Sequence, residues 1–396
     1  MRRITTLLCF LLTACAFAPA PAAQSVAPAN AAQSVAPSAV PTTSEAPAAP
    51  GRARLEPPDG ALFGVNLDWG TDTAAAVSER LGVTPAAWVQ FVAFPLDDGG
   101  RANLDAFVEQ VASVHGLALI TLEPNDGLAS VTDAAVADLA TTLQGYAELR
   151  VPILVRFGHE MNGSWYAWGQ QPAAYIEAYR RVAAAVHEIP DAATVWAPNY
   201  GAGYPFSGGR SEALPDTPDF ALLDTDYDGT LTAADDPYAP YYPGDKAVDW
   251  VGMSLYHWGN VHPWGENEVP EPGAFVARLT GTYAGANGDE TDLPDFYADY
   301  TIGHDKPMAI TETAALWDPA GPGPSGAEIT LAWFGQVFGT DVHARFPRLR
   351  MINWFEWRKD EAEVGRVIDW RLSADPQLAR SLLTDVPPGW LRFADE

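Results

Sequence analysis

The sequence predicts an α/β fold, a (β/α)8 TIM barrel, because short apolar runs alternate with amphipathic stretches along most of its length. From about residue 53, eight runs have the length and composition of buried strands: 61–67, 88–94, 117–122, 151–157, 194–198, 250–256, 307–312 and 349–355. Ala-rich amphipathic stretches that suit helices lie at 132–149, 171–188, 325–344 and 375–384. Eight strand–helix units within one domain, residues 53–396, favour a closed barrel. An open doubly wound sheet is the alternative, but the sequence has no Gly-rich phosphate-binding motif to support it.

The first 15 residues have the features of an export signal. The chain begins with a basic Met-Arg-Arg, and the apolar run at 4–12 is too short to span a bilayer as a helix. The sequence Leu-Thr-Ala-Cys at 12–15 then resembles a bacterial lipobox, in which the cysteine is lipidated and becomes the mature N-terminus. We therefore expect a secreted lipoprotein that Cys15 anchors to a membrane at the bacterial cell surface. Ordinary secretion, with cleavage near Ala22 or Ala23, is the alternative.

Residues 16–52 have the composition of a linker. They are almost entirely Ala, Pro, Ser, Gln, Val and Thr, and the pentapeptide QSVAP occurs at 24–28 and again at 33–37. Such a segment cannot bury a hydrophobic core, and its prolines favour extended chain. We expect a disordered tether between the membrane anchor and the folded domain.

The charge and cysteine content restrict the possible partners. The chain has 51 acidic and 23 basic residues, for a formal net charge of −28. Such a surface repels the phosphates of nucleic acids, so nucleic acid is not an expected partner, whereas a neutral polysaccharide is compatible with it. Both cysteines, Cys9 and Cys15, lie in the export signal, so the folded domain has no disulfide and no cysteine metal site. We expect a monomer.

The most informative motif is RFGHEMNGSWYAWG at 156–169. It begins at the end of the fourth predicted strand and places His159, Glu160, Trp165 and Trp168 in one short loop. A glutamate beside a histidine, with indole rings around it, can grip a sugar and protonate a glycosidic oxygen. A half-buried glutamate beside a helix-capping asparagine is the structural alternative. We expect His159 to orient other groups rather than to act as a base, because Glu160 already fills that role.

A second carboxylate, Glu312, ends the seventh predicted strand in the segment KPMAITETA at 306–314. Because the carboxyl ends of parallel barrel strands meet at one face, Glu312 is expected near Glu160. Hydrolysis of a glycosidic bond needs two such carboxyl groups, one to donate a proton and one to attack or to activate water. Other polar and aromatic residues fall at the same strand ends: Asn66, Asp68, Trp69, Glu123, Asn125, Asn199, Tyr200, Tyr256, His257, Trp258 and Trp354. The candidates for stacking on sugar rings are Trp165, Trp168, Trp258, Trp264, Trp317 and Trp354.

The chain resembles glycoside hydrolase family 26 over roughly residues 55–395. The resemblance rests on RFGHEMNGSWYAWG at 156–169, VWAPN at 195–199, YYPGDKAVDWVGMSLY at 241–256, ITET at 310–313 and VIDWRLSADP at 367–376. His159 is the specific feature, because most of the related families have asparagine before the acid glutamate. The family consists of retaining (β/α)8 enzymes, among them endo-β-1,4-mannanases, mixed-linkage β-glucanases and β-1,3-xylanases.

This resemblance implies a retaining endo-β-glycanase with Glu160 as the acid/base and Glu312 as the nucleophile. It also implies a subsite at the scissile bond that is lined by His159, Trp165 and Tyr256. Three further substrate contacts are expected near the same strand ends: Trp168, Asn199 and Trp354. β-1,4-Mannan is the first expected substrate, with mixed-linkage β-1,3-1,4-glucan and β-1,3-xylan as alternatives, and no cofactor is expected for catalysis.

The chain departs from the family pattern in the loop that carries the acid. Many mannanases of the family have RPxHE and WFWWG there, whereas this chain has Phe157-Gly158 in the first motif and WYAWG at 165–169. Ala167 removes an aromatic wall. Both glutamates remain, but the expectation of mannan specificity is weakened. A surface lipoprotein that binds glycans without cleaving them is the alternative of another class, and the presence of both glutamates argues against it.

A separate motif, DTDYDGTLTAAD at 224–235, has the spacing of an EF-hand calcium loop. Aspartates occupy its positions one, three, five and twelve, glycine occupies position six, and position seven offers a backbone carbonyl. The expected ligands of a structural Ca²⁺ are Asp224, Asp226, Asp228, Thr230 and Asp235. An acidic surface turn is the alternative. The loop lies in a long insertion, about 200–248, between the fifth and sixth strands. A bound ion would stabilise this insertion.

Overall fold

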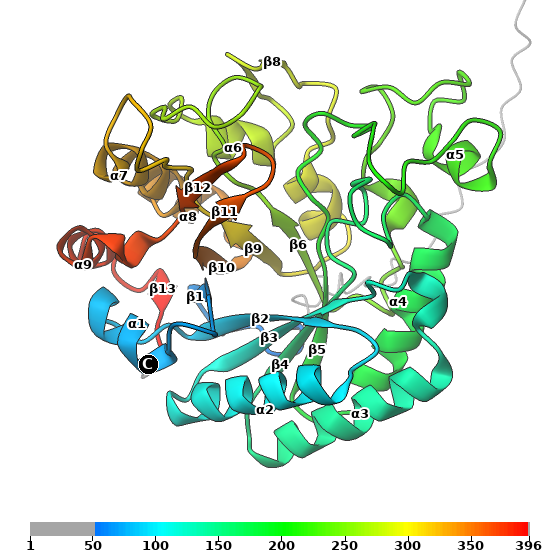
Figure 1. The fold of residues 1–396 in the computed structure, drawn as a ribbon, viewed down its shortest axis with the longest axis horizontal. Coiled ribbons are helices and arrows are strands. Elements are labelled where there is room, and N and C mark those ends of the chain that lie inside the picture. Colours follow the sequence, from blue (N-terminus) through cyan, green and yellow to red (C-terminus); the bar gives the residue numbers. More distant parts are fainter. Residues whose placement is uncertain (1–51, 395–396) are drawn as a thin grey trace, which may run out of the picture. The chain divides into compact units, whose positions relative to one another are not determined.

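The computed structural model describes residues 52–394, and this part of the chain forms the predicted (β/α)8 barrel (Figure 1). Its eight parallel strands are β1 (Ala61–Leu67), β2 (Ala87–Ala93), β3 (Leu117–Glu123), β4 (Ile153–Phe157), β5 (Ala192–Trp196), β6 (Trp250–Ser254), β9 (Met308–Thr313) and β10 (Leu349–Glu356). Each strand pairs with the next one along the chain, and β10 returns to pair with β1, which closes the sheet. The strand ends differ from the predicted ones by at most two residues. The predicted export signal and the linker up to residue 51 lie outside the described residues.

Helices surround the barrel. They are α1 (Ala74–Leu81), α2 (Asp98–Ser113), α3 (Asp133–Glu148), α4 (Pro172–Val186), α5 (Pro218–Leu223), α6 (Ala274–Leu279), α7 (Gly326–Val337), α8 (Thr340–Arg345) and α9 (Pro376–Thr384). The stretch predicted as one helix at 325–344 is two helices, because Gly339 adopts an extended conformation and starts α8 as its N-cap. None of the helices within residues 52–394 is both long and apolar enough to cross a membrane.

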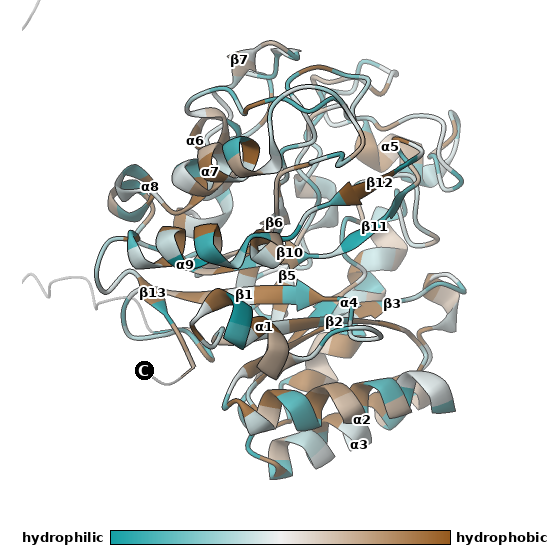
Figure 2. Cartoon of the chain, turned by 60° about the vertical axis from the view of Figure 1, so that its left-hand side comes forward, coloured by the Kyte–Doolittle hydropathy of each residue, from teal (hydrophilic) through white to brown (hydrophobic). Residues whose placement is uncertain are grey.

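Local sequence signals set the starts of the helices. Thr132 caps α3 by accepting a hydrogen bond from the backbone N–H of Ala135, and α4 begins with Pro172, whose fixed φ suits a first helical turn. Helix α7 begins with a capping box formed by Ser325 and Glu328. In Figure 2, hydrophobic and hydrophilic residues alternate around α2 and α3. Each helix can therefore bury one side against the barrel and expose the other.

The strands divide the core into two parts, because successive side chains of a strand point to opposite faces. The barrel interior is filled by apolar side chains such as Val89, Leu119 and Leu154, and a larger cluster that includes Ile120 lies between the strands and the helices. Arg156 lies two residues after Leu154 in β4 and is fully buried. Strand β4 thus carries a charged side chain into the interior of the barrel.

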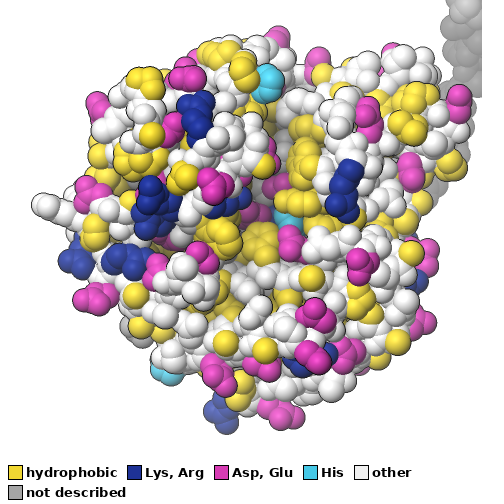
Figure 3. Space-filling view, in the orientation of Figure 1, with side chains coloured by type: hydrophobic (Ala, Val, Ile, Leu, Met, Phe, Trp, Pro, Cys, Tyr) yellow, Lys and Arg dark blue, Asp and Glu magenta, His cyan; other side chains and the backbone are white. Residues whose placement is uncertain are grey.

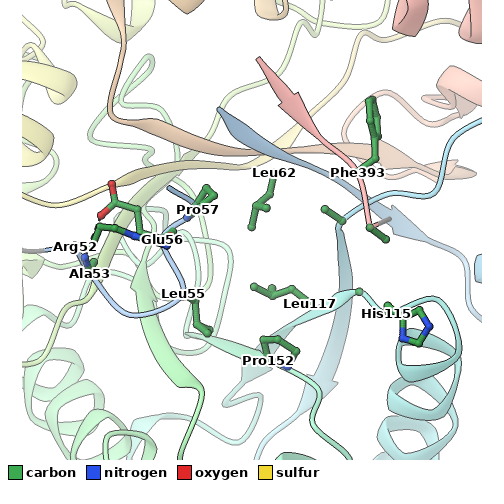
Figure 4. A pocket seen from close by; sticks show the side chains of 13 residues that line it. Arg52, Ala53, Leu55, Glu56, Pro57, Leu62, His115, Leu117, Pro152 and Phe393 are labelled. Atoms are coloured by element: carbon green, nitrogen blue, oxygen red, sulfur yellow. Dashed lines mark hydrogen bonds between the residues drawn. The ribbon is translucent and has the colours of Figure 1, made fainter. Parts of the chain in front are cut away.

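The end of the barrel where the strands begin is covered by residues 52–57 (Figure 4). An open pocket of about 550 Å³ at this end is lined largely by apolar side chains, among them Leu55, Leu62 and Leu117. The carboxylate of Glu56 is almost fully buried and lies 3.3 Å from Nε of Arg350 and 3.6 Å from Nε of Arg348. The charges at this end are paired with one another, and we assign them a structural role.

Insertions and short hairpins rise around the opposite end of the barrel (Figure 1). The segment between β5 and β6 contains α5 and a 3₁₀ turn at Ala239–Tyr241. The antiparallel pair β7 (Ala284–Gly285) and β8 (Gly288–Asp289) follows α6, and the pair β11 (Arg358–Glu361) and β12 (Arg366–Asp369) follows β10. The last strand, β13 (Leu391–Arg392), pairs with β1 beside the barrel. These additions shape the rim at the carboxyl ends of the strands.

Candidate active site

A cleft of about 960 Å³ opens at the carboxyl ends of the barrel strands. All eight strand ends contribute to its lining, with Asn66, Phe91, Glu123, His159, Glu160, Asn199, Tyr256, Glu312 and Phe355. Figure 3 shows a hollow near the centre of this face, with acidic and histidine side chains inside it and hydrophobic side chains around it. The fold therefore brings both glutamates of the sequence motifs into one cleft.

The loop after β4 holds Glu160 in an unusual backbone conformation. Glu160 and Gly158 both have a φ of 53°, in the left-handed region that a residue with a side chain rarely occupies. The backbone N–H of Glu160 donates to the oxygen of Ala197 at 3.1 Å. Asn162 is fully buried, accepts from the backbone N–H of Asn199 at 2.9 Å and donates to its oxygen at 2.8 Å. These contacts fasten the loop to the end of β5 and compensate the backbone strain.

Glu312 is held by donors from β4 and from the end of β6. It is 6% exposed, and its Oε1 forms an ion pair with Nη1 of the fully buried Arg156. The hydroxyl of Tyr256 donates to Oε2 at 2.8 Å, and the hydroxyl of Ser254 lies 3.5 Å from Oε1. Arg156 also donates to the hydroxyl of Ser254 at 2.8 Å. The carboxylate is thereby fixed in one orientation with its charge compensated.

Glu160 has a very different electrostatic environment. Burial and the nearby negative charge of Glu312 raise the pKa of Glu160 to about 7, against the opposing effects of Arg156 and of hydrogen bonds from Ser254 and Trp165. A carboxyl group with such a pKa can give up or take up a proton near neutral pH. Burial and Glu312 also raise the pKa of a third carboxyl group in the cleft, Glu123, to about 6.

His159 lies among aromatic rings on the cleft wall. Its ring centroid is 5.2 Å from that of Phe91, 4.7 Å from that of Tyr166 and 5.5 Å from that of Trp168. Burial, with a smaller effect of the positive charge of Arg156, holds the pKa of His159 well below its usual range. The imidazole is therefore neutral near pH 7 and can offer an uncharged hydrogen-bonding group to a ligand.

Two tryptophans that we expected to contact substrate do not line the cleft. Trp168 is fully buried, donates from Nε1 to the backbone oxygen of His159 at 2.7 Å, and stacks on Tyr166 at 4.4 Å. Tyr166 reaches the cleft in its place. Trp354 points away from the cleft because its neighbour in β10, Phe355, points into it, and adjacent strand residues face opposite sides.

The other expected contacts are at the cleft. Trp165 is 37% exposed there, and Asn199 and Tyr256 line the wall beside the glutamates. Of the remaining candidates for stacking on sugars, Trp258 and Trp264 line the cleft, whereas Trp317 does not. The loops after β4 and β6 thus contribute part of the aromatic wall of the cleft.

The acidic loop of the insertion brings together three of the four aspartates that we expected as metal ligands. Carboxylate oxygens of Asp224, Asp226 and Asp235 lie within 4.8 Å of one another. Asp224 accepts a hydrogen bond from the backbone N–H of Gly229 at 3.0 Å, which sets the turn of the loop. The carboxylate of Asp228 is not in this group, because it accepts from the backbone N–H and the hydroxyl of Thr230. Three acidic side chains therefore converge as a hard oxygen site requires.

Arg156 is the residue at the centre of the site whose role the sequence motif did not reveal. A signal was present, since a charged residue inside a run of buried strand residues needs a buried partner of opposite charge. The role of Ser254 had no comparable signal, because a serine near a strand end is common in proteins of every class.

The fold and the site together define a class of protein. A (β/α)8 barrel with two glutamates at the ends of its fourth and seventh strands, one of them with a raised pKa, has the pair of carboxyl groups that glycoside hydrolysis requires. The family model described as Glycosyl hydrolase family 26 matches residues 113–198, which contain β3 to β5 and Glu160. This segment of the chain is similar to glycosyl hydrolase family 26.

Curated relatives are similar to part of the chain. A β-1,3-xylanase of Alcaligenes sp is 24% identical over 211 residues, which cover 51% of this chain and 39% of the xylanase. Endoglucanase H of Acetivibrio thermocellus is 24% identical over 248 residues, which cover 62% of this chain and 21% of that protein. The aligned part therefore spans less than half of either relative.

Solved structures share the fold. An endo-β-1,4-mannanase double mutant from Cellulomonas fimi aligns with a TM-score of 0.51 and 19% identity, over 85% of this chain and 73% of that one. The GH26C protein of Muricauda sp. MAR_2010_75 aligns with a TM-score of 0.54 and 14% identity, over 85% of this chain and 88% of that one. At these identities the likeness establishes the shared barrel.

We predict that Asn162→Ala weakens both folding and turnover. The change leaves the backbone N–H and oxygen of Asn199 without their partners, which should cost about 1–3 kcal/mol of unfolding free energy. Because the loop then holds Glu160 less firmly, kcat should fall by about 10- to 100-fold. Urea denaturation and steady-state kinetics measure the two effects. Asn162→Asp keeps the acceptor and should lose less, and an unchanged kcat in Asn162→Ala would rule out the positioning role.

Proposed function

We propose that this protein is a retaining endo-β-glycanase that hydrolyses a neutral β-linked polysaccharide, with β-1,4-mannan as the first substrate to test. The observation that carries the proposal is the unequal pair of carboxyl groups in the cleft. Glu312 is fixed by Arg156 and Tyr256, whereas Glu160 has a pKa near neutrality. One group suits nucleophilic attack and the other suits proton transfer.

The charges of the cleft support a neutral substrate. Beyond the catalytic pair, the acidic residues of the lining are Asp68, Glu123, Glu290, Glu361 and Glu363, and the lysine and arginine residues are Lys359 and Arg278. Together with the net charge of −28 on the chain, this excess of carboxylates disfavours a polyanionic substrate. Aromatic side chains on the same walls, such as Trp165 and Trp258, offer surfaces on which sugar rings can stack.

The proposed reaction has two steps. In the first, Glu312 attacks the anomeric carbon while protonated Glu160 gives its proton to the departing glycosidic oxygen, and the sugar becomes an ester of Glu312. The negative charge of Glu312 is then gone, so one cause of the raised pKa of Glu160 is removed. In the second step Glu160 takes a proton from water, which displaces Glu312 from the sugar.

Three polysaccharides are candidate substrates. The relatives named above include a β-1,3-xylanase, an endoglucanase and an endo-β-1,4-mannanase. A reducing-sugar assay on soluble β-1,4-mannan, mixed-linkage β-glucan and β-1,3-xylan separates these possibilities. Binding to one of the three polymers without release of reducing ends would favour the alternative, a surface protein that captures glycans.

We predict that hydrolysis retains the anomeric configuration. Proton NMR should show the β-anomer as the first product of a β-linked substrate. Glu312→Ala should lose turnover on the order of 10⁴- to 10⁶-fold, as is seen when other covalent nucleophiles are removed. Glu160→Ala should be slowed least on aryl glycosides with good leaving groups, and azide should rescue it. An α-anomer appearing first would remove Glu312 from the nucleophile role.

We predict that the activity has an alkaline limit near pH 7. Glu160 must carry its proton to act as the acid, so kcat/KM should hold below its pKa of about 7 and fall as the pH rises through that value. The measurement is kcat/KM against pH on a polysaccharide. In Glu160→Gln, kcat/KM on an aryl glycoside whose leaving group needs no acid should not fall as the pH rises through about 7. If this fall persists in the variant, another group causes it.

We propose that Asp224, Asp226 and Asp235 hold a structural Ca²⁺ that stabilises the insertion. Asp235 is 1% exposed and accepts from backbone N–H groups of Thr225 and Thr232, at 2.6 and 2.8 Å, so its carboxylate is already held in place. The bound ion would offset the mutual repulsion of the three carboxylates and would have no part in the chemistry.

We predict that Ca²⁺ raises the melting temperature and that Asp226→Ala abolishes this effect. A ligand at 100 times its Kd stabilises the native state by about 2.7 kcal/mol. Differential scanning fluorimetry with and without Ca²⁺ measures the shift, and kcat at low temperature should change little. Asp289→Ala is the control, because it removes an exposed aspartate outside the loop at 224–235, one that accepts from the N–H and hydroxyl of Thr291. Immediate loss of activity in EDTA with the barrel still folded would contradict a structural role.

We also propose that Cys15 carries lipid and holds the enzyme at the cell surface. The lipobox-like sequence at 12–15 and the Pro-rich residues after it support this location. We predict that Cys15→Ser moves the protein from the membrane fraction to the soluble fraction. An intact mass of the native protein that corresponds to cleavage after Ala22 or Ala23 would refute the anchor.

A further inference from the structure

A second polar cluster lies in the cleft, apart from the two glutamates and their partners. It consists of Tyr200, Arg278, Asn287 and Glu290, all of which line the cleft. Arg278 belongs to α6, and Asn287 and Glu290 lie on either side of β8. The two-step hydrolysis gives none of these residues a task, although one of them is a nearly buried cation.

The guanidinium of Arg278 makes few hydrogen bonds with the described residues. Arg278 is 7% exposed, and its one hydrogen bond to the described residues is a 3.5 Å contact from Nη1 to the backbone oxygen of Tyr256. Its Nε is buried without a hydrogen-bond partner in residues 52–394. The rings of Tyr283 and Tyr200, with centroids 4.6 and 5.9 Å from Cζ, hold the cation in place. Since a guanidinium offers five N–H donors, its Nη groups keep donors that a ligand in the cleft can use.

An acceptor is built into the same wall. The carboxylate of Glu290 accepts a hydrogen bond from the hydroxyl of Tyr200 at 2.6 Å and another from the side-chain amide of Asn287 at 3.0 Å. The amide oxygen of Asn287 in turn accepts from the backbone N–H of His262 at 3.1 Å. This chain of hydrogen bonds fixes Glu290, which is partly exposed and has lone pairs left for a ligand.

The cluster is adjacent to the catalytic pair. Tyr256 joins the two, because its hydroxyl donates to Glu312 and its backbone oxygen accepts from Arg278. Tyr200 directly follows Asn199 at the end of β5, and its backbone N–H donates to the oxygen of Ser254 at 3.1 Å. A chain of sugars bound across the catalytic pair would therefore extend onto this cluster.

We propose that Arg278 and Glu290 form a sugar-binding subsite beside the scissile bond, in which they recognise the hydroxyl groups of a neutral sugar. The proposal rests on the proposed hydrolase function and extends it to substrate selection. A sugar hydroxyl is both donor and acceptor, so a wall with a donor-only cation and an acceptor-only carboxylate can satisfy both of its capacities. A carboxylate on the sugar would pair with Arg278 but would be repelled by Glu290.

The first test compares substrates of different length. Arg278→Met removes the donors but keeps a long side chain, and Glu290→Gln keeps the shape but removes the charge. The substrates are oligosaccharides of about two to six sugars from whichever of the three polymers the wild type cleaves. For those long enough to reach the subsite, kcat/KM should fall by about tenfold to a hundredfold, mainly through KM, as expected for lost hydrogen bonds to charged groups. For the shortest ones it should change by less than about twofold.

A control variant separates this effect from a general loss of charge. Arg345→Met removes a cation that also lies over a ring, that of Phe346, at 5.5 Å, on a helix that contributes nothing to the cleft lining. It should leave every substrate unaffected. If Arg278→Met lowers kcat/KM equally at all lengths, or changes only the melting temperature, Arg278 is a structural residue and the subsite assignment is wrong.

The second test measures binding without turnover. Calorimetry on Glu160→Gln, with and without Arg278→Met, should show weaker binding of the longer neutral oligosaccharides in the double variant. Tighter binding of oligosaccharides that carry uronic acids would overturn the assignment to neutral sugars. A wild type that cleaves none of the three polymers would refute the proposed function, whereas cleavage with no length-dependent effect of Arg278→Met would refute the subsite alone.

Discussion

The ion pair between Arg156 and Glu312 is the interaction on which the site depends. Both groups are almost completely removed from water, and the loss of hydration is offset by their mutual attraction and by hydrogen bonds with Ser254 and Tyr256. These four residues come from β4, β6 and β9 or the residues that follow them, so the pair ties three strand ends together. It also acts on Glu160, because the carboxylate of the pair raises the pKa of Glu160 and the guanidinium lowers it. One buried contact thus fixes the orientation of one glutamate and also changes the proton affinity of the other, which burial raises first.

The barrel and the two glutamates could be predicted from the sequence because the signals are local. Each strand is a short apolar run, and a residue just after such a run must lie at the carboxyl end of a parallel sheet. This reasoning was enough to place Glu160 and Glu312 in one cleft. The aromatic wall of the cleft was harder to predict, because a tryptophan in the sequence looks the same whether its side chain lies at the cleft surface or is buried beneath it. Trp168 lies beneath Tyr166, and the pleat of β10 turns Trp354 toward the helices.

The features that could not be predicted depend on contacts between distant parts of the chain. Tyr200 and Glu290 are 90 positions apart, and no periodicity or motif connects them, yet their side chains share a hydrogen bond. Side-chain directions in the acidic loop at 224–235 also depend on contacts that the sequence pattern does not specify. Its spacing predicts which aspartates lie in the turn, but the direction of Asp228 depends on the competing N–H and hydroxyl of Thr230. Sequence patterns specify the elements and their ends, while packing and competition between nearby donors decide which side chains meet.

The closure of the barrel has a consequence for how the chain can acquire its structure. Strand β1 has neighbours from both ends of the sequence, since it pairs with β2 on one side and with β10 and β13 on the other. A chain that emerges from the ribosome N-terminus first therefore holds an open sheet, with an unpaired edge on β1, until some 290 further residues have been made. Unpaired strand edges are sites of aggregation. The order of synthesis thus favours a late, concerted completion of the fold, in which the last fifty residues convert an open, association-prone sheet into a barrel without edges.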